Sequence, residues 1–445
     1  MVVYKCLHNS KKYIKIYLYT NKLYQYMETI IGPPGTGKTR EIEKEIEGKK
    51  NYVYMTYNVN MAEAARERID GNPSRIGTFH SILSQMMGLG NFLSSRDVQE
   101  FMDKYRLKYP DFKRFERWYT AVAHSMQKPF EPMDERINMP DLLDRYNIYK
   151  EDNGKIDYTD IIKMAAEADL QTDYLYIDEA QDLTPLMWKV VDNFNAEKTI
   201  AGDPHQSINS YTGVDVDEFL KRMRNVRTLD VSYRYGDNLR MMADRALSNG
   251  RVMKVEYRGM GNTEIQKHDL NGFLKLEGTK AILCRSNALA ENVASSLNAI
   301  VMPVNPDHSY NLGWTHRVFR IIGAIKKFPK ITGSEREYLS KYSKAFSGSS
   351  MPLESFGTWD FGLKLPKIER DNVVRALKEN LPEVYVDTIH STKGLEFDHV
   401  FIFIDMPRPY MFSLEEKRVI YTGITRARQS LDYSYRGFYS EKYAV

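Results

Sequence analysis

The stretch that decides the fold is Gly32-Pro33-Pro34-Gly35-Thr36-Gly37-Lys38-Thr39, between a short apolar run at 28–31 and a helical pattern at 40–47. It fits G-x-x-x-x-G-K-[ST], in which glycines let backbone N–H groups surround phosphates and the helix N-terminus adds positive potential. Lys38 is expected to reach the β- and γ-phosphates, and Thr39 to bind Mg²⁺. We therefore predict a nucleotide site over Gly32–Thr39 that extends to Arg40.

An acidic segment further along the chain suits the same chemistry. The apolar run 174–177 ends in Asp178-Glu179-Ala180-Gln181-Asp182. A buried strand that delivers adjacent carboxylates can place one on the metal and one beside the attacking water. Asp178 is predicted to hold Mg²⁺ and Glu179 to act as the catalytic base. The alternative, an exposed acidic turn, is disfavoured by the preceding apolar run.

The next apolar run ends in Gly202-Asp203-Pro204-His205-Gln206-Ser207. The neutral amide of Gln206 could hydrogen-bond the γ-phosphate or its attacking water, and could thereby report the state of the nucleotide. Similar β-rich runs recur at 52–55, 199–201, 281–284 and 400–404, and several lead into helical patterns. Strands that alternate with helices predict an α/β fold with parallel sheets.

The charge of the chain is unevenly distributed. Its 445 residues carry a formal net charge of +4, yet residues 1–27 hold five lysines and no acid. The rest has 58 basic residues against 59 acidic ones, so it is close to neutral. We interpret 1–27 as an N-terminal arm, poorly ordered as many chain termini are.

Two local strips combine cations with aromatic rings, at 104–128 and 317–344. Such mixtures suit a nucleic-acid groove, where cations contact phosphates and rings stack on bases. The alternative is a structural role, because Phe112, Phe115, Tyr119 and Val122 recur at helical spacing, as in a core-facing stripe. The sequence leaves both interpretations open.

Two cysteines, Cys6 and Cys284, are too few for a disulfide framework or a zinc site. No run of about 18 apolar residues is present, so we expect no membrane-spanning helix. We accordingly expect a cytoplasmic protein. Association with a nucleoid and presence in a phage-infected cell are both compatible with this location.

The order of motifs resembles the UvrD/Rep subgroup of superfamily 1 helicases. After the glycine loop come TFHS at 78–81, DEAQD at 178–182 and GDPHQSINSYTG at 202–213. SYR at 232–234, CRSN at 284–287, TIHSTKGLEF at 388–397 and YTGITRAR at 421–428 follow. Together these eight segments span residues 32–428 in the order of the family.

The resemblance implies two RecA-like P-loop NTPase domains with parallel sheets, each carrying an inserted, mainly helical subdomain. Domain 1A would comprise residues 28–90 and 168–230, with insertion 1B at 91–167. Domain 2A would comprise 231–305 and 381–445, with insertion 2B at 306–380. ATP would bind in the cleft between the two RecA-like domains.

The resemblance also assigns roles to single residues. Arg234 and Arg426 match the arginines that approach the γ-phosphate, Gln206 matches the phosphate sensor, and Glu396 matches a contact to the nucleotide sugar. Guanidinium groups supplied on cleft closure would stabilise charge in the transition state. The positions that match DNA contacts are Tyr57, Phe79, His80, Tyr211 and His390.

Several positions depart from the family pattern. The usual glutamine segment that reads adenine is not recognisable before the loop, where Gln25 is seven residues before Gly32. Val59 and Asn60 replace the usual Asn-Lys, and Asn209 and Thr212 replace an aromatic residue and an arginine. Insertion 2B has only 75 positions, fewer than is usual in the family.

From these features we predict an ATP-dependent translocase that moves 3′→5′ on single-stranded DNA and unwinds duplex DNA, with Mg²⁺ as cofactor. Its partners would be single strands and single-strand/duplex junctions, with an accessory replication or repair protein and no membrane. One alternative is a DNA-stimulated ATPase that remodels or recruits a partner without processive unwinding. Others are a 5′→3′ superfamily 1 helicase and an RNA helicase.

Overall fold

A computed structural model describes residues 27–126, 137–247, 253–297, 299–302, 333–342, 383–404 and 413–435, with single positions at 321, 325, 364, 365, 370 and 373. The predicted arm up to residue 26, most of the predicted insertion 2B and most of the strip 317–344 lie outside these residues. The chain divides into two compact units: 1–232 with 251–257, and 233–250 with 258–445. The finer subdomain boundaries stay a prediction.

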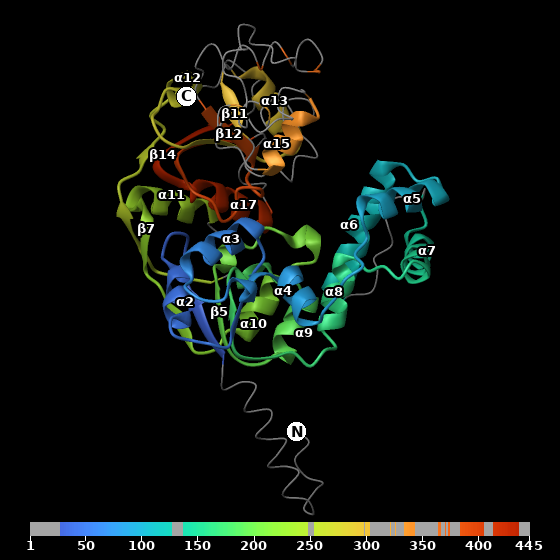
Figure 1. Ribbon diagram of the computed structural model, residues 1–445. Helices are drawn as coiled ribbons and strands as arrows, with labels where there is room; N and C mark the ends of the chain where they lie inside the picture. Colours follow the sequence, from blue (N-terminus) through green and yellow to red (C-terminus); the bar gives the residue numbers. More distant parts are fainter. Residues whose placement is uncertain are drawn as a thin grey trace, which may run out of the picture. The chain divides into compact units, whose positions relative to one another are not determined.

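Unit 1 contains a six-stranded sheet in the order β3-β2-β4-β5-β1-β6, with parallel pairing throughout (Figure 1). Its strands are β1 (Met27–Ile31), β2 (Tyr52–Thr56), β3 (Ile76–Thr78), β4 (Gln171–Ile177), β5 (Asn195–Gly202) and β6 (Val226–Thr228). Because parallel strands end at the same edge, the glycine loop after β1 and the acidic segment after β4 share one edge. The sheet topology therefore assembles the predicted site.

Helices cover both faces of this sheet, and the side chains of each strand alternate between the two layers. Tyr52 and Tyr54 of β2 pack with Ile42 of α2, whereas Val53 and Met55 pack in the opposite layer. The core helices are α2 (Lys38–Ile46), α3 (Val59–Arg68), α4 (Phe79–Met86), α8 (Tyr158–Ala165), α9 (Pro185–Asn193) and α10 (Val216–Arg222). The two-sided burial explains why the strands read as nearly continuous apolar runs.

The helical insertion of unit 1 has a core of its own. Its helices are α5 (Ser95–Tyr105), α6 (Tyr109–Ser125) and α7 (Met139–Asp152), which project beside α8 in Figure 1. Phe112, Phe115 and Tyr119 of the strip 104–128 are buried in this core with Phe101 and Tyr146. The structural interpretation of those rings is therefore correct, while the cations Arg106, Lys108, Arg114 and Arg117 are exposed.

A buried lysine fastens the insertion to α8. Lys150 Nζ donates to Asp157 at 2.8 Å and to Asp160 at 2.6 Å, and it also lies over the rings of Tyr119 and Tyr146. The Lys150 side chain is only 5% exposed, so both carboxylates compensate a charge that has little water around it. This cluster fixes α7 against the start of α8.

Unit 2 has a second six-stranded sheet, β11-β12-β10-β13-β14-β9, again paired in parallel. The strands are β9 (Glu264–Ile265), β10 (Lys280–Cys284), β11 (Ile300–Met302), β12 (Glu383–Thr388), β13 (Phe397–Ile404) and β14 (Ala427–Tyr435). The described helices are α11 (Asp237–Leu247), α12 (Leu270–Leu274), α13 (Asn287–Ser296), α15 (Gly333–Ser340) and α17 (Leu414–Ile424). The predicted α/β class with parallel sheets is confirmed.

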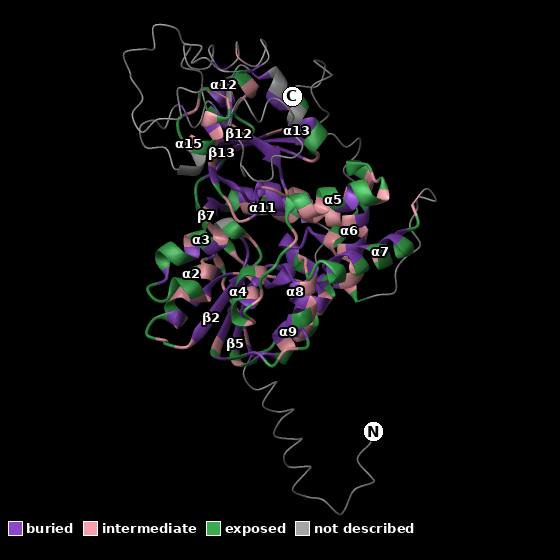
Figure 2. Cartoon of the chain, turned by 45° about the vertical axis from the view of Figure 1, so that its right-hand side comes forward, coloured by how far each residue is buried: buried purple, intermediate pink, exposed green. Residues whose placement is uncertain are grey.

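A two-stranded ribbon and several short 3-10 turns complete the described structure. The ribbon pairs β7 (Val231–Gly236) with β8 (Arg258–Gly261), and the turns are η1 (Pro73–Arg75), η2 (Ala180–Asp182), η3 (Pro204–Gln206) and η4 (Ser210–Thr212). Figure 2 shows burial concentrated in the strands of each sheet. No helix among the described residues is long and apolar enough to cross a bilayer.

His124 links the insertion to the motor core, and its burial makes the stability of unit 1 depend on pH. Its Nδ1 lies 3.0 Å from the hydroxyl of Thr184, and its side chain is 4% exposed. Burial, followed by the charges of His80 and Lys163, lowers the pKa of His124 from 6.5 to about 4. Between these pH values the unfolded state binds more protons, so stability falls as the pH drops.

We expect a fall from pH 7 to pH 5 to cost unit 1 about 2 kcal/mol through His124 alone. The His124→Gln variant keeps a polar group next to Thr184, but the glutamine amide does not titrate. The free energy of unfolding of this variant should therefore lose the pH dependence that His124 causes. Urea unfolding of both proteins at the two pH values measures the difference. An equal pH dependence in both would contradict the assignment.

Candidate nucleotide site

The loop from Gly32 to Thr39 connects β1 to α2, as the sequence predicts. Gly37 has φ +87°, a left-handed conformation that a glycine adopts without strain, and it forms the N-cap of α2. Lys38 is buried, and its Nζ donates to the carbonyls of Gly32 at 2.6 Å and Pro33 at 3.3 Å. The ammonium group is thus held inside the curve of the loop, where a phosphate would meet it.

Thr39 and Asp178 are in direct contact, although 139 residues separate them. The Thr39 hydroxyl donates to Asp178 Oδ2 at 2.6 Å. Asp178 is 1% exposed, and burial, followed by the charge of Glu179, raises its pKa. A hydroxyl and a carboxylate oxygen side by side are oxygen ligands of the kind that would hold Mg²⁺. These two residues fit the predicted metal site.

Tyr54 is a partner of Asp178 that no sequence motif indicates. Its hydroxyl donates to Asp178 Oδ2 at 3.0 Å, and burial, followed by the charge of Asp178, raises the pKa of this phenol well above 10.0. The Tyr54 side chain therefore stays a hydrogen-bond donor near neutral pH. Tyr54 pairs with Tyr176 in neighbouring strands, a register that the sequence pattern did not reveal.

Glu179 is the second residue after β4 and has a strained backbone conformation. Its φ of +56° is in the left-handed region, which is unfavourable for a residue with a side chain. The Glu179 carboxylate accepts a hydrogen bond from the amide of Gln181, and its backbone N–H donates to Asp178 at 2.9 Å. The turn separates two adjacent carboxylates so that they face different partners.

Gln181 is a second residue of the site to which the sequence motifs assign no role. Its amide nitrogen donates to Glu179, and its amide oxygen accepts from the backbone N–H of Asp203 at 2.9 Å. Gln206 donates to Asp203 Oδ2 at 3.1 Å. Gly202 carries no side chain next to the Gln181 amide, and a Cβ there would approach the amide oxygen within 2.5 Å. A polar chain thus joins Glu179 to Gln206.

Asp203 anchors this chain as a carboxylate. Burial by itself would raise the pKa of Asp203, but hydrogen bonds and charge from His205, together with the charge of Lys38, outweigh burial and lower it. Both of its oxygens are used, because Oδ1 accepts from the backbone N–H of His205 at 3.0 Å. The position of Gln206 therefore depends on an ionised group behind it.

Ser232 ties the glycine loop to the end of unit 1. Its hydroxyl donates to the carbonyl of Pro34 at 2.8 Å, although the two residues are 198 positions apart. The SYR segment thus contacts the loop through its first residue. Thr36, Pro34 and Gly35 complete the loop, and Arg40 is exposed on α2.

The predicted residues of unit 2 also gather. Arg234 Nε donates to Glu396 at 2.7 Å, and its terminal nitrogen donates to the carbonyl of Thr425 at 3.1 Å. Arg428 lies 3.5 Å from the other oxygen of Glu396. Arg426 is buried and donates to the carbonyls of Thr422 and Leu395, both at 3.0 Å. Contacts of Arg234, Arg426 and Glu396 with a nucleotide stay a prediction.

The predicted DNA contacts fall into two groups. Tyr57 and Tyr211 are exposed, at 37% and 63%, while His80 and His390 are partly exposed. Phe79 corrects the prediction, because its ring is 1% exposed and packs in the core with Val53 and Leu83. A ring enclosed in this way presents no face on which a base could stack, so Phe79 positions α4 instead.

Two family models match the chain. One, a UvrD-like helicase C-terminal domain, matches residues 383–431, and the other, an AAA domain, matches residues 19–212. Together the two matches cover the glycine loop, the DEAQD segment and the strands β12 and β13.

A curated relative is the F-box DNA helicase 1 of Gallus gallus, 22% identical over 89% of this chain and 46% of that protein. The chain therefore spans about half the length of the relative it matches. Solved structures that it resembles include the PRRSV helicase, at 12% identity, covering 95% of this chain and 54% of that one, with a TM-score of 0.38. An arterivirus nonstructural protein 10 helicase in complex with DNA is 11% identical, covering 95% and 64%, with a TM-score of 0.36.

The contact between Thr39 and Asp178 makes a testable prediction about the metal. Asp178→Asn keeps the shape of the side chain but removes its charge, so nucleotide binding should lose its enhancement by Mg²⁺ while metal-free binding persists. Titration of a fluorescent nucleotide with and without Mg²⁺ measures this. Asp169→Asn, at an exposed position, should behave as the unaltered protein. A full Mg²⁺ effect in the Asp178 variant would refute the metal role.

Proposed function

Since this chain belongs to the UvrD-like helicases of superfamily 1, we propose that it hydrolyses Mg²⁺-bound ATP to move 3′→5′ along single-stranded DNA and to unwind duplex DNA. The observation that carries the proposal is the contact of Thr39 with Asp178, next to Glu179 and its polar link to Gln206. This arrangement has a metal-binding pair, a candidate base and a candidate sensor at one sheet edge.

In the proposed mechanism, the loop N–H groups and Lys38 bind the phosphates, while Thr39 and Asp178 hold the metal. Mg²⁺ supplies charge neutralisation on the β- and γ-phosphates when bound. Glu179 accepts a proton from the attacking water, and its bond from Gln181 orients the carboxylate. Gln206, linked through Asp203, senses the γ-phosphate and passes its state to the residues that follow η3.

The geometry around η4 supports the coupling of hydrolysis to DNA. Asn209 donates to Asp182 Oδ1 at 3.3 Å, so the turn that carries Tyr211 is attached to the acidic segment. The hydroxyl of Thr212 donates to the Asn209 carbonyl at 2.8 Å. We infer that a shift of Gln206 is transmitted along this short path to the exposed ring of Tyr211.

The second candidate function is a DNA-stimulated ATPase that remodels or recruits a partner without processive unwinding. Two features of the sequence support this alternative. Insertion 2B, at residues 306–380, is shorter than is usual in the family, and the segment 56–61 departs from the family pattern. DNA-stimulated hydrolysis without strand displacement on any tailed duplex would favour this alternative.

Lys38→Ala should lower the rate of ATP hydrolysis by at least about 100-fold, because it removes the cation that stabilises developing charge. Steady-state ATPase assays with saturating single-stranded DNA measure the effect. Lys44→Ala is the matched control, since Lys44 lies on the same helix with a 61% exposed side chain. An equal loss in both variants would argue for a general effect on α2.

Glu179→Gln should retain nucleotide binding but reduce turnover by roughly 10²- to 10⁴-fold, because an amide cannot accept the proton. Glu167→Gln, at an exposed position, should leave both unchanged. Nucleotide affinity and turnover are measured on the same preparation. Near-normal turnover in the Glu179 variant would exclude this residue as the base.

Polarity is tested with duplexes that carry either a 3′ or a 5′ single-stranded tail. The proposal predicts strand displacement from the 3′-tailed substrate, with ATP and Mg²⁺ present. Strand displacement only from 5′-tailed substrates would show that the chain moves 5′→3′ and would contradict the proposed polarity. Stimulation of ATP hydrolysis by RNA but not by DNA would indicate an RNA helicase.

A further inference from the structure

Tyr54 is a fully buried tyrosine of β2 whose hydroxyl reaches the candidate metal site. In the sheet it lies opposite Tyr176 of β4, and Asp178 follows Tyr176 by two positions, so these side chains lie on one face of the sheet. The backbone N–H of Asp178 also donates to the carbonyl of Met55 at 3.0 Å. Strand β2 therefore holds Asp178 twice, by its backbone and by its carboxylate.

The carboxylate of Asp178 receives hydrogen bonds from three different parts of unit 1. Its Oδ2 accepts from the hydroxyls of Thr39 at 2.6 Å and Tyr54 at 3.0 Å, and its Oδ1 accepts from the backbone N–H of Glu179 at 2.9 Å. Thr39 belongs to the glycine loop and Glu179 to the acidic segment. Tyr54 belongs to neither, because it lies inside a strand whose five residues are all buried. Its position is therefore fixed by packing and not by contacts with a nucleotide.

The orientation of a metal-binding carboxylate depends on the groups that bond it from behind, and removing such a partner typically weakens metal binding about 10- to 100-fold. Asp178 is 1% exposed, so water cannot readily replace a donor that is taken away. Without the Tyr54 hydroxyl, Oδ2 would lose its bond to β2 and keep the bond from Thr39, a residue that is itself expected to bind the metal. Tyr54 is thus placed to orient the carboxylate independently of the metal.

A purely structural role is the alternative for a buried tyrosine hydroxyl, and the same core contains an example. Tyr176 packs in one cluster with Tyr54, and its hydroxyl donates to the backbone carbonyl of Glu45 at 3.2 Å. That bond joins β4 to α2 through a backbone atom. The acceptor of Tyr54 is instead the carboxylate that the metal site requires. This difference between two neighbouring tyrosines indicates a role of Tyr54 beyond packing.

We propose that Tyr54 is a positioning residue for the magnesium-bound nucleotide, because its hydroxyl holds the Asp178 carboxylate in the orientation in which Asp178 and Thr39 bind the metal. This inference rests on the proposed function, from which it takes the metal site, and it adds to that site a residue that touches neither the metal nor the nucleotide. Since Tyr54 acts through Asp178, its loss should lower the affinity for Mg²⁺ and leave the affinity for the metal-free nucleotide unchanged.

The first test measures the affinity of the intact chain for a fluorescent ADP analogue over a series of Mg²⁺ concentrations. Tyr54→Phe keeps the ring in the core and removes only the hydroxyl. It should raise the Mg²⁺ concentration that gives the half-maximal gain in nucleotide affinity about tenfold, because the carboxylate loses its bond to β2. In EDTA the variant and the unaltered chain should bind the analogue equally. An unchanged Mg²⁺ midpoint, in a variant that still unfolds cooperatively in urea, would overturn the proposal.

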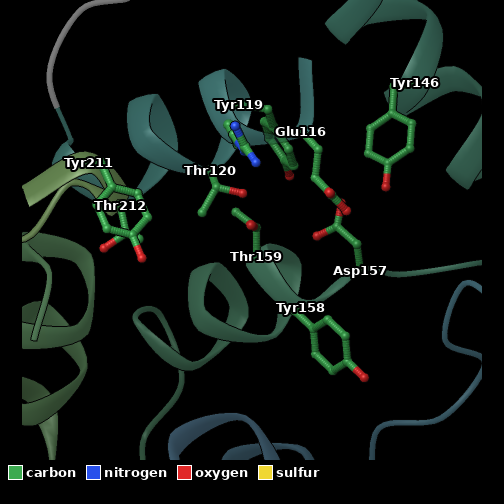
Figure 3. Close-up of a pocket in the computed structure, with 10 residues that line it drawn as sticks. Glu116, Tyr119, Thr120, Tyr146, Asp157, Tyr158, Thr159, Tyr211 and Thr212 are labelled. Atoms are coloured by element: carbon green, nitrogen blue, oxygen red, sulfur yellow. The ribbon is translucent and has the colours of Figure 1, made fainter. Parts of the chain in front are cut away.

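Two matched variants separate positioning from a general loosening of the core. Tyr176→Phe removes the neighbouring hydroxyl of the same core. Tyr146→Phe removes a hydroxyl that bonds another carboxylate, that of Asp157. Tyr146 and Asp157 line a groove between the helical insertion and the motor core, which Tyr211 also lines (Figure 3). Both changes should lower the urea midpoint of unfolding and leave the Mg²⁺ midpoint unchanged. An equal shift of the Mg²⁺ midpoint in the Tyr54 and Tyr176 variants would refute a specific role of Tyr54.

The second test measures metal binding directly. Binding of Mn²⁺ to the chain with ADP, followed by the loss of the EPR signal of the free ion, should be weakened about tenfold by Tyr54→Phe. Excess Mg²⁺ should restore ATP turnover in this variant, which a damaged core would not allow. If the unaltered chain shows no effect of Mg²⁺ on nucleotide binding, the proposed metal site fails together with this inference. A normal Mg²⁺ effect that Asp178→Asn abolishes and Tyr54→Phe leaves intact would reject the inference alone.

Discussion

The candidate site depends on one buried carboxylate, that of Asp178 at the end of β4. A carboxylate with 1% exposure is costly unless its oxygens are satisfied. The hydroxyls of Thr39 and Tyr54 and the backbone N–H of Glu179 supply these bonds. They draw the first residues of α2, strand β2 and the turn after β4 toward a single point, and this convergence gives the loop and the acidic segment their common geometry.

From this point a polar chain extends across the sheet edge. Glu179, Gln181, Asp203 and Gln206 follow one another by hydrogen bonds, and Asn209 attaches η4 to Asp182. Each link is buried, so a change in one partner leaves the next without a ready substitute from water. The chain provides a physical route by which events at a phosphate could reach the exposed ring of Tyr211 and the groove beside it.

Much of this was predictable from short sequence segments, because their chemistry is local. The glycine loop, the carboxylates after β4 and the amide after β5 were placed correctly at strand ends. The prediction for Phe79 was wrong for an instructive reason. Its neighbour His80 is partly exposed, and only the packing of α4 against the core that contains Val53 of β2 decides which of the two adjacent rings is buried.

The sequence by itself determined the α/β class, the glycine loop and the identity of the candidate metal-binding and catalytic side chains, because loop conformation and strand-end position follow from residue type and spacing. Tertiary structure alone decided the partners of those side chains. Tyr54 meets Asp178 from 124 positions away, and the ring of Tyr158 in α8 meets that of His80 in α4. Such contacts depend on strand order and on how the insertion packs, which no local spacing records.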